Sequence, residues 1–119
     1  MFDRLRDEQP GCAEKVIAIS SELTQPELGL TKEDQDKSME SIDIVFHGAA
    51  TIRFNESLRD AMQLNVIATR QLLHLAQKMK KLEVFVHVST AYANRDRKNT
   101  EEIVYPPPVD PRKLIESLE

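Results

Sequence analysis

Three clusters of small or hydroxyl-bearing residues stand where apolar runs of the sequence end. Small residues let a ligand approach the backbone closely, and hydroxyl groups can hydrogen-bond to it. In open α/β sheets, ligands bind beyond the carboxyl ends of the strands. The clusters therefore favour a nucleotide-binding site, although strands also end in small turn residues for structural reasons alone. They are Ser20-Ser21-Glu22, Gly48-Ala49-Ala50-Thr51 and Ser89-Thr90-Ala91-Tyr92.

Two polar residues, Asn65 and Thr69, interrupt the apolar face of a predicted helix about one turn apart. A buried polar side chain without a partner costs about 1–3 kcal/mol. We therefore expect Asn65 to hydrogen-bond to backbone, at the end of a neighbouring strand. We interpret this bond mainly as a structural tie, which would also shape the ligand-binding edge of the sheet.

Short apolar runs rich in β-branched residues predict strands. They alternate with predicted helices, an order typical of a parallel sheet with crossover helices. Strands that are apolar almost throughout are covered on both faces in such sheets. The sequence therefore predicts an α/β fold, part of a Rossmann-type doubly wound parallel sheet that is incomplete at both ends. The runs are residues 16–19, 42–47 and 83–88.

Pairs of capping residues mark the starts of the helices. Thr31 with Asp34, and Ser57 with Asp60, have the spacing of a capping box. They predict helices over about residues 31–40 and 57–80. Apolar residues line one face of the longer helix, and we expect the opposite face to lie in water. That polar face carries Arg59, Gln63, Arg70, His74, Gln77 and Lys78.

Both ends of the chain read as parts of helices. Phe2 and Leu5 are typical of the tail of one helix, and Asp110-Pro111 caps another that follows an extended loop at residues 105–108. A three-stranded parallel sheet leaves its edges unpaired. We therefore expect a fragment of a larger domain that folds only marginally by itself. The last helix has Leu114, Ile115 and Leu118 on its apolar stripe.

Composition excludes several classes of protein. Of 119 residues, 40% are hydrophobic and 30% are charged, unlike a disordered or a membrane-spanning chain. The net charge of −4 comes from interspersed acids and bases, so we expect no nucleic-acid partner. Cys12 is the only cysteine, which fits an intracellular, reducing compartment. His47 and His87 lack metal-ligand partners at useful spacing, so we expect hydrogen-bonded packing residues and no metal site.

Longer stretches of the chain resemble one enzyme family. Their order and spacing are similar to those of the fatty acyl-CoA reductases, an extended branch of the short-chain dehydrogenase/reductase superfamily. The Asn65 and Thr69 pair is shared across the superfamily, whereas the first and third stretches are more specific to reductases of acyl thioesters. The stretches are residues 44–54 (IVFHGAATIRF), 64–69 (LNVIAT) and 85–92 (FVHVSTAY).

The resemblance implies an NADPH-dependent reduction of long-chain fatty acyl-CoA to a fatty alcohol plus CoA, through an aldehyde. It implies that Ser89 or Thr90 hydrogen-bonds the substrate carbonyl oxygen, and that the backbone of Gly48-Ala49-Ala50 lies along the cofactor. Glu22 stands where relatives usually carry an aspartate that approaches the adenine. The parent protein would lie at the endoplasmic reticulum or peroxisome membrane, although this chain has no membrane segment of its own.

Two motifs of that family are absent from these residues. Gly11, Gly29 and Gly48 form no glycine-rich phosphate loop, and neither Tyr92 nor Tyr105 has a lysine four positions later. We therefore expect residues 1–119 to be a partial NAD(P)-binding domain without reductase activity by itself. Two alternatives stay open: a fragment of another extended short-chain reductase or epimerase, and a noncatalytic truncated module that binds a nucleotide or a partner.

Overall fold

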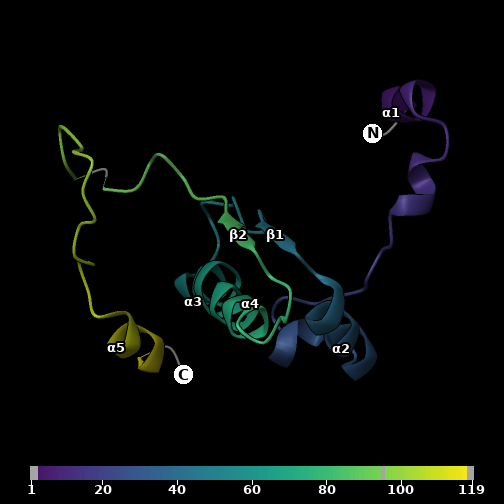
Figure 1. The fold of residues 1–119 in the computed structure, drawn as a ribbon. Helices are drawn as coiled ribbons and strands as arrows, with labels where there is room; N and C mark the ends of the chain where they lie inside the picture. Colours follow the sequence, from purple (N-terminus) through teal and green to yellow (C-terminus); the bar gives the residue numbers. More distant parts are fainter. Residues whose placement is uncertain (1–2, 95, 118–119) are drawn as a thin grey trace.

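The computed structural model describes residues 3–94 and 96–117 (Figure 1). Short helical segments dominate it, and the strands occupy its middle. The elements in chain order are α1 (Asp3–Glu8), η1 (Cys12–Lys15), η2 (Pro26–Gly29), α2 (Lys32–Ser41), β1 (Ile44–His47), α3 (Leu58–Met62), η3 (Gln63–Ile67), α4 (Ala68–Ala76), β2 (Val84–His87) and α5 (Pro111–Glu116).

Within the described residues, β1 and β2 form a parallel two-stranded sheet. Ile44 pairs with Val84 at one end of the ladder, and His47 pairs with His87 at the other. Parallel strands require a long crossover connection, which is supplied here by the continuous helix α3–η3–α4. Figure 1 shows this helix beside the sheet. The predicted strand–helix–strand order is confirmed for the second and third apolar runs.

The long helix covers only one face of the sheet. Along β1 the side chains alternate: Val45 and His47 are half-buried and buried, whereas Ile44 and Phe46 are 51% and 74% exposed. This period of two is that of a strand with one covered face. The structure therefore shows an α/β arrangement with one helix layer. A second layer, which a doubly wound sheet has, is not found in the part of the chain that is described.

The predicted first strand is wrong. Residues 16–22 have no regular structure, and Val16 and Ile17 are 67% and 68% exposed. β-Branched residues favour strands only where a neighbouring strand supplies hydrogen bonds and packing. In the described chain β1 pairs with β2, and residues 16–19 pair with neither strand. The run is therefore an irregular connection between η1 and η2.

The predicted helix starts are confirmed. The hydroxyl oxygen of Thr31 accepts a hydrogen bond from the backbone N–H of Asp34, and that of Ser57 accepts one from Asp60, each at 3.1 Å. The carboxylate of Asp110 caps α5 in the same way. Each cap satisfies a first-turn donor that has no partner inside the helix. The long helix ends at Ala76, earlier than the predicted end near residue 80.

Few side chains are buried in the described residues. Leu114 and Ile115 are half-buried as predicted for α5, and α1 buries none of its residues. Phe2 and Leu118, which the sequence places on apolar helix faces, lie outside the described residues. Among the described residues, His47 is the only buried residue with an aromatic ring. The buried residues are Leu28, Gln35, His47, Ala68 and Ala76.

Candidate functional site

The carboxyl ends of β1 and β2 open at the same edge of the sheet. The strands end on the paired residues His47 and His87, and the N–H of Val88 donates to the carbonyl of His47 at 2.9 Å. A Cβ added at Gly48 would lie 3.8 Å from a methyl group of Val88. Residues 48–50 and 88–90 therefore leave the sheet side by side, and all of them are exposed.

Asn65 ties the long helix to the segment that follows β1. Its side-chain oxygen accepts a hydrogen bond from the N–H of Thr51 at 2.8 Å, and its amide nitrogen donates to the carbonyl of Thr51 at 3.4 Å. The predicted bond to backbone beyond a strand end is confirmed. The predicted burial is wrong, because Asn65 is exposed: it lies beyond the last paired residues of the strands, where the sheet no longer covers the helix.

Thr69 and His47 form further hydrogen bonds next to this tie, between the long helix and β1. Nε2 of His47 lies 2.9 Å from the hydroxyl oxygen of Thr69, and that hydroxyl donates to the carbonyl of Asn65 at 2.9 Å. A threonine hydroxyl has a single proton. Assigning this proton to the bond with Asn65 makes His47 the donor in the first bond. The neutral ring therefore carries its proton on Nε2.

The environment of His47 keeps its ring uncharged. The residue is 3% exposed, and its ring stacks on that of His87 with centroids 5.1 Å apart and planes inclined by 30°. Burial lowers the pKa of His47 below its ordinary value of 6.5, and repulsion from a protonated His87 lowers this pKa further. The prediction of a hydrogen-bonded packing residue is confirmed for His47. His87 is exposed and packs through the ring contact.

The long helix changes geometry at this site. The segment η3 is π-helical, and the N–H of Ala68 bonds to the carbonyl of Gln63, five residues back. π-Helical turns are rare in proteins overall, but those that do occur are frequently at functional sites. This π-helical turn was not predicted from the sequence. Its available signal was a polar Asn65 inside an apolar stretch, followed by a threonine able to bond to the carbonyl four residues before it.

Ser89 and Thr90 follow β2 after Val88, and both are exposed at this edge. The hydroxyl oxygen of Thr90 accepts a hydrogen bond from the N–H of Tyr92 at 3.2 Å. A hydroxyl that accepts one bond still has its proton to donate. Either residue can therefore offer an O–H to a ligand that occupies the space beyond the strands.

Glu22 lies elsewhere in the structure than the sequence predicts. It follows an irregular segment, so it is not at the end of a strand. Its carboxylate accepts hydrogen bonds from the hydroxyl of Thr24 at 2.8 Å and the N–H of Thr24 at 3.3 Å, which together lower the pKa of Glu22. Its own N–H donates to the carbonyl of Leu28 at 2.8 Å. Glu22 is thus the first residue of a closed turn that continues into η2.

This turn has an unusual backbone. Glu27 and Leu28 have φ angles of 53° and 61°, and Gly29 follows at 63°. A non-glycine residue in this left-handed region costs about 1–3 kcal/mol. At Gly29 an added Cβ would lie 3.0 Å from the backbone nitrogen of Glu22, so only glycine fits there. Contacts with the rest of the chain must offset the strain of the other two residues.

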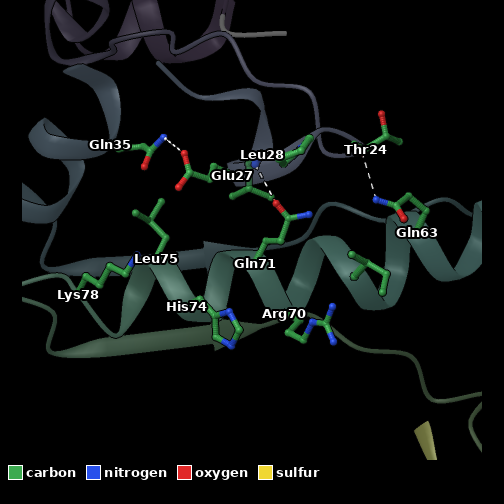
Figure 2. Close-up of a pocket in the computed structure, with 12 residues that line it drawn as sticks. Thr24, Glu27, Leu28, Gln35, Gln63, Arg70, Gln71, His74, Leu75 and Lys78 are labelled. Atoms are coloured by element: carbon green, nitrogen blue, oxygen red, sulfur yellow. Dashed lines mark hydrogen bonds between the residues drawn. The ribbon is translucent and has the colours of Figure 1, made fainter. Parts of the chain in front are cut away.

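Glutamine side chains supply these contacts. The oxygen of Gln71 accepts a hydrogen bond from the N–H of Leu28 at 3.1 Å, and the amide of Gln63 donates to the carbonyl of Thr24 at 3.1 Å (Figure 2). From α2, the buried Gln35 donates to the carboxylate of Glu27 and to the carbonyl of Leu30. The turn is therefore fastened to the outer face of the long helix.

A cavity of about 440 Å³ lies between this turn and the helix (Figure 2). Arg70, His74 and Lys78 line it, and all of them are exposed. The sequence analysis placed these residues on a face open to water. Their exposure is confirmed, but the turn that borders this face was not predicted, because the bonds that hold it join residues about 40 positions apart.

The segment after β2 has its own small cluster. The guanidinium of Arg97 lies 4.1 Å from the centre of the Tyr105 ring, and the oxygen of Tyr105 accepts a hydrogen bond from the N–H of Glu101 at 2.9 Å. Residues 96–98 are exposed, and residues 104–107 form no helix or strand. Arg95 lies outside the described residues.

In residues 3–94 and 96–117, no group of three or more histidine, cysteine, aspartate or glutamate side chains has an arrangement that could hold a metal ion. No helix in these ranges is both long enough and apolar enough to cross a membrane. Cys12 is a free cysteine and is half-buried.

Comparison with known families supplies the class of this domain. An NAD-binding family described as Male sterility protein matches residues 1–118. The chain therefore belongs to this family, and its parallel strands with their crossover helix are part of a Rossmann-like domain that binds a nicotinamide cofactor. The exposed small residues 48–50 fit such a ligand, because their backbone can be approached closely at the end of a strand.

Individual relatives carry more specific names. The chain is 82% identical to fatty acyl-CoA reductase 1 of Xenopus laevis and 68% identical to that of Homo sapiens. It is 47% identical to fatty acyl-CoA reductase 2 of Homo sapiens. Each match covers 100% of this chain and 23% of the relative. The family resemblance read from the sequence is confirmed, and the chain spans about a quarter of the length of these relatives.

Proposed function

We propose that the protein to which this chain belongs is an NADPH-dependent fatty acyl-CoA reductase. It converts long-chain acyl-CoA to a fatty alcohol and CoA through an aldehyde. The names of the relatives at 82% and 68% identity support this substrate class. The structural observation that carries the proposal is the exposed backbone of residues 48–50 beside the hydroxyls of Ser89 and Thr90 at one sheet edge.

The hydroxyl of Ser89 or Thr90 has a defined chemical task in this reaction. When bound, NADPH would supply hydride to the carbonyl carbon, and negative charge would develop on the carbonyl oxygen. An O–H donor held at the strand end stabilises that charge. In the first reduction the carbon–sulfur bond would break and CoA would leave. In the second, another NADPH would supply hydride to the aldehyde carbon, and the aldehyde oxygen would gain a proton. Loss of one such donor typically lowers kcat by about 10²–10³.

Other residues of the chain would hold the cofactor. The backbone of Gly48-Ala49-Ala50 would lie along it, supported from behind by Asn65 and Thr69. Glu22 is the candidate contact for the adenine. Its carboxylate is exposed and ionised at neutral pH, so it can accept a hydrogen bond from an amino group. The preference for NADPH over NADH belongs to the same proposal.

We also propose that residues 1–119 are part of a doubly wound Rossmann domain. The glycine-rich loop and the Tyr-x-x-x-Lys pair would come from other segments of the protein. The exposed apolar face of the sheet, with Ile44 and Phe46, supports a covering layer, since parallel sheets are covered on both faces.

We propose that the protein is intracellular and lies at the endoplasmic reticulum or peroxisome membrane. The free thiol of Cys12 supports the first part of this proposal, because unpaired cysteines fit a reducing compartment. Fractionation of cells that express the full-length protein, with detection by an antibody, tests both parts. Recovery of the protein from the culture medium would contradict them.

The test of the enzyme proposal is product analysis with the full-length protein. Incubation with palmitoyl-CoA and NADPH should yield a C16 alcohol, and NADH should support a slower reaction. Ser89→Ala and Thr90→Val, assayed one at a time, identify the hydroxyl that matters. Absence of alcohol with every acyl-CoA and both cofactors would contradict the proposal.

A second candidate concerns the chain as an isolated piece. Residues 1–119 contain no Tyr-x-x-x-Lys pair, which favours a noncatalytic module that binds a nucleotide or a partner. We expect purified residues 1–119 to form no alcohol from acyl-CoA and NADPH. Turnover by this piece would show that its proton donor lies within the residues printed here.

A further inference from the structure

His47 occupies a position where three parts of the site meet. Its carbonyl accepts the N–H of Val88, the first residue beyond β2. Its ring stacks on that of His87, the last residue of β2. On its other side, Nε2 donates to Thr69 of the long helix at 2.9 Å. His47 therefore contacts the residue that follows β2 and the long helix, and it directly precedes residues 48–50 in the chain.

The hydrogen bonds of His47 continue to the cofactor-facing segment by a second route. The hydroxyl of Thr69 donates to the main-chain carbonyl of Asn65. The side chain of Asn65 in turn bonds to the N–H and the carbonyl of Thr51. Residues 48–50 are thus fixed at both ends, by His47 before them and by Thr51 after them. The imidazole of His47 is linked to the second support through the Thr69 hydroxyl.

We propose that His47 is a positioning residue, which sets the distance between the backbone of residues 48–50 and the hydroxyls of Ser89 and Thr90. The proposal rests on the proposed function, since that distance matters only if cofactor and substrate meet there. The residue touches neither reacting group, and its side chain acts through Thr69 and Asn65. Small displacements of aligned reactants are costly: a shift of about 1 Å can lower the rate about 100-fold.

The chemistry of the contact provides a matched pair of variants. Glutamine places its side-chain nitrogen the same number of bonds from the backbone as Nε2 of histidine, so His47→Gln keeps a donor within reach of Thr69. In His47→Asn the nitrogen corresponds to Nδ1 and falls short of Thr69. Both variants are neutral amides of similar polarity, and they differ in the one hydrogen bond that the proposal requires.

The experiment measures kcat and KM of the full-length protein with palmitoyl-CoA and NADPH. His47→Asn should lower kcat by about 10- to 100-fold, with KM for palmitoyl-CoA changed by less than about threefold. His47→Gln should restore kcat to within about threefold of the wild-type value. His74→Asn, a change at an exposed histidine on the outer face of the helix, controls for loss of histidine in general.

A measurement without turnover separates this proposal from the proposed function. NADPH fluorescence titration should give a dissociation constant raised about fivefold in His47→Asn and near the wild-type value in His47→Gln. If the wild-type protein makes no alcohol, the proposed function fails, and the titration alone decides about His47. Equal values for the glutamine and asparagine variants, in kcat where turnover is seen and in the titration, would overturn the positioning role.

Discussion

Residues 16–22 and residues 84–90 are similar as sequences and different as structures. Each has a run rich in β-branched residues followed by hydroxyl-bearing ones. The second run forms β2, paired with β1 and placed beside the long helix. The first is irregular, with Val16 and Ile17 exposed. The difference lies in the neighbours: a strand forms where another strand and a packing layer are present, and a favourable composition does not replace them.

The same contrast separates the two expected parts of the ligand site. Gly48-Ala49-Ala50 and the pair Ser89, Thr90 are brought together by the parallel register. Glu22 is held in a turn that glutamines fasten to the outer face of the helix. We therefore expect changes at the sheet edge to affect catalysis and changes at the turn to affect mainly stability.

The largest effect should come from removing the hydroxyls at the sheet edge. In the full-length protein, the double substitution Ser89→Ala and Thr90→Val should lower kcat for alcohol formation by at least about 100-fold, because the developing charge on the carbonyl oxygen loses its donor. The matched control is Ser20→Ala with Ser21→Ala, in the run that forms no strand. Equal losses in the two double variants would remove the distinction between the regions.

A smaller loss is expected when the support of residues 48–51 is removed. Asn65→Ala deletes both hydrogen bonds to Thr51, and we expect about a tenfold lower kcat together with a loss of about 1 kcal/mol in unfolding free energy. Asn65→Asp keeps the acceptor for the N–H of Thr51 and loses only the longer bond. It should therefore lie between wild type and Asn65→Ala in steady-state kinetics. An aspartate variant as impaired as the alanine variant would contradict this order.

At the turn, stability and activity should separate. Gln71→Leu removes the acceptor for the N–H of Leu28, and we expect a loss of about 1 kcal/mol, seen as a lower midpoint of thermal unfolding. Gln71→Glu retains an acceptor oxygen and serves as the control. In both variants kcat should stay near the wild-type value. A fall in kcat comparable to that of Asn65→Ala would show that the turn takes part in the chemistry.

The smallest effect should be a dependence of stability on pH. The pKa of His47 is lowered in the folded chain by burial and by His87, so the unfolded chain binds protons more readily below pH 6.5. This contribution to stability is present above about pH 6.5 and is lost as the pH falls toward the lowered pKa. His87 is the titratable group that faces the ring, and Thr69 on the helix is neutral.

His47→Gln removes this titration and provides the measurement. Between about pH 7.5 and pH 5.5, the thermal midpoint of the wild-type protein should fall further than that of the glutamine variant. Parallel curves for the two proteins would mean that His47 is not the group responsible.

The features that could be predicted from the sequence are those that depend on residues close together in the chain. The caps at Thr31, Ser57 and Asp110 are local contacts between residues two or three positions apart, and all of them were predicted correctly. The bond from Asn65 to backbone was predicted because a polar group in an apolar face requires a partner. The class of partner was correct, whereas the burial of Asn65 was not.

The features that sequence analysis missed depend on distant residues. The turn at residues 22–29 is held by Gln63 and Gln71, about 40 positions away, and its left-handed residues Glu27 and Leu28 have no sequence signature. The stack of His47 on His87 arises only when the two strands pair in the observed register. The failed strand at residues 16–19 has the same origin, a partner that local sequence does not reveal.

The central claim is that the cofactor lies at the edge formed by the ends of β1 and β2. Hydrogen–deuterium exchange of the full-length protein, with and without NADPH, tests it most directly, because bound cofactor slows exchange of the amides that it covers. We predict protection of residues 48–51 and 88–92, with any change in the turn at residues 22–29 confined to Glu22, the candidate adenine contact. Protection confined to residues 22–29, with the strand ends unchanged, would contradict the account.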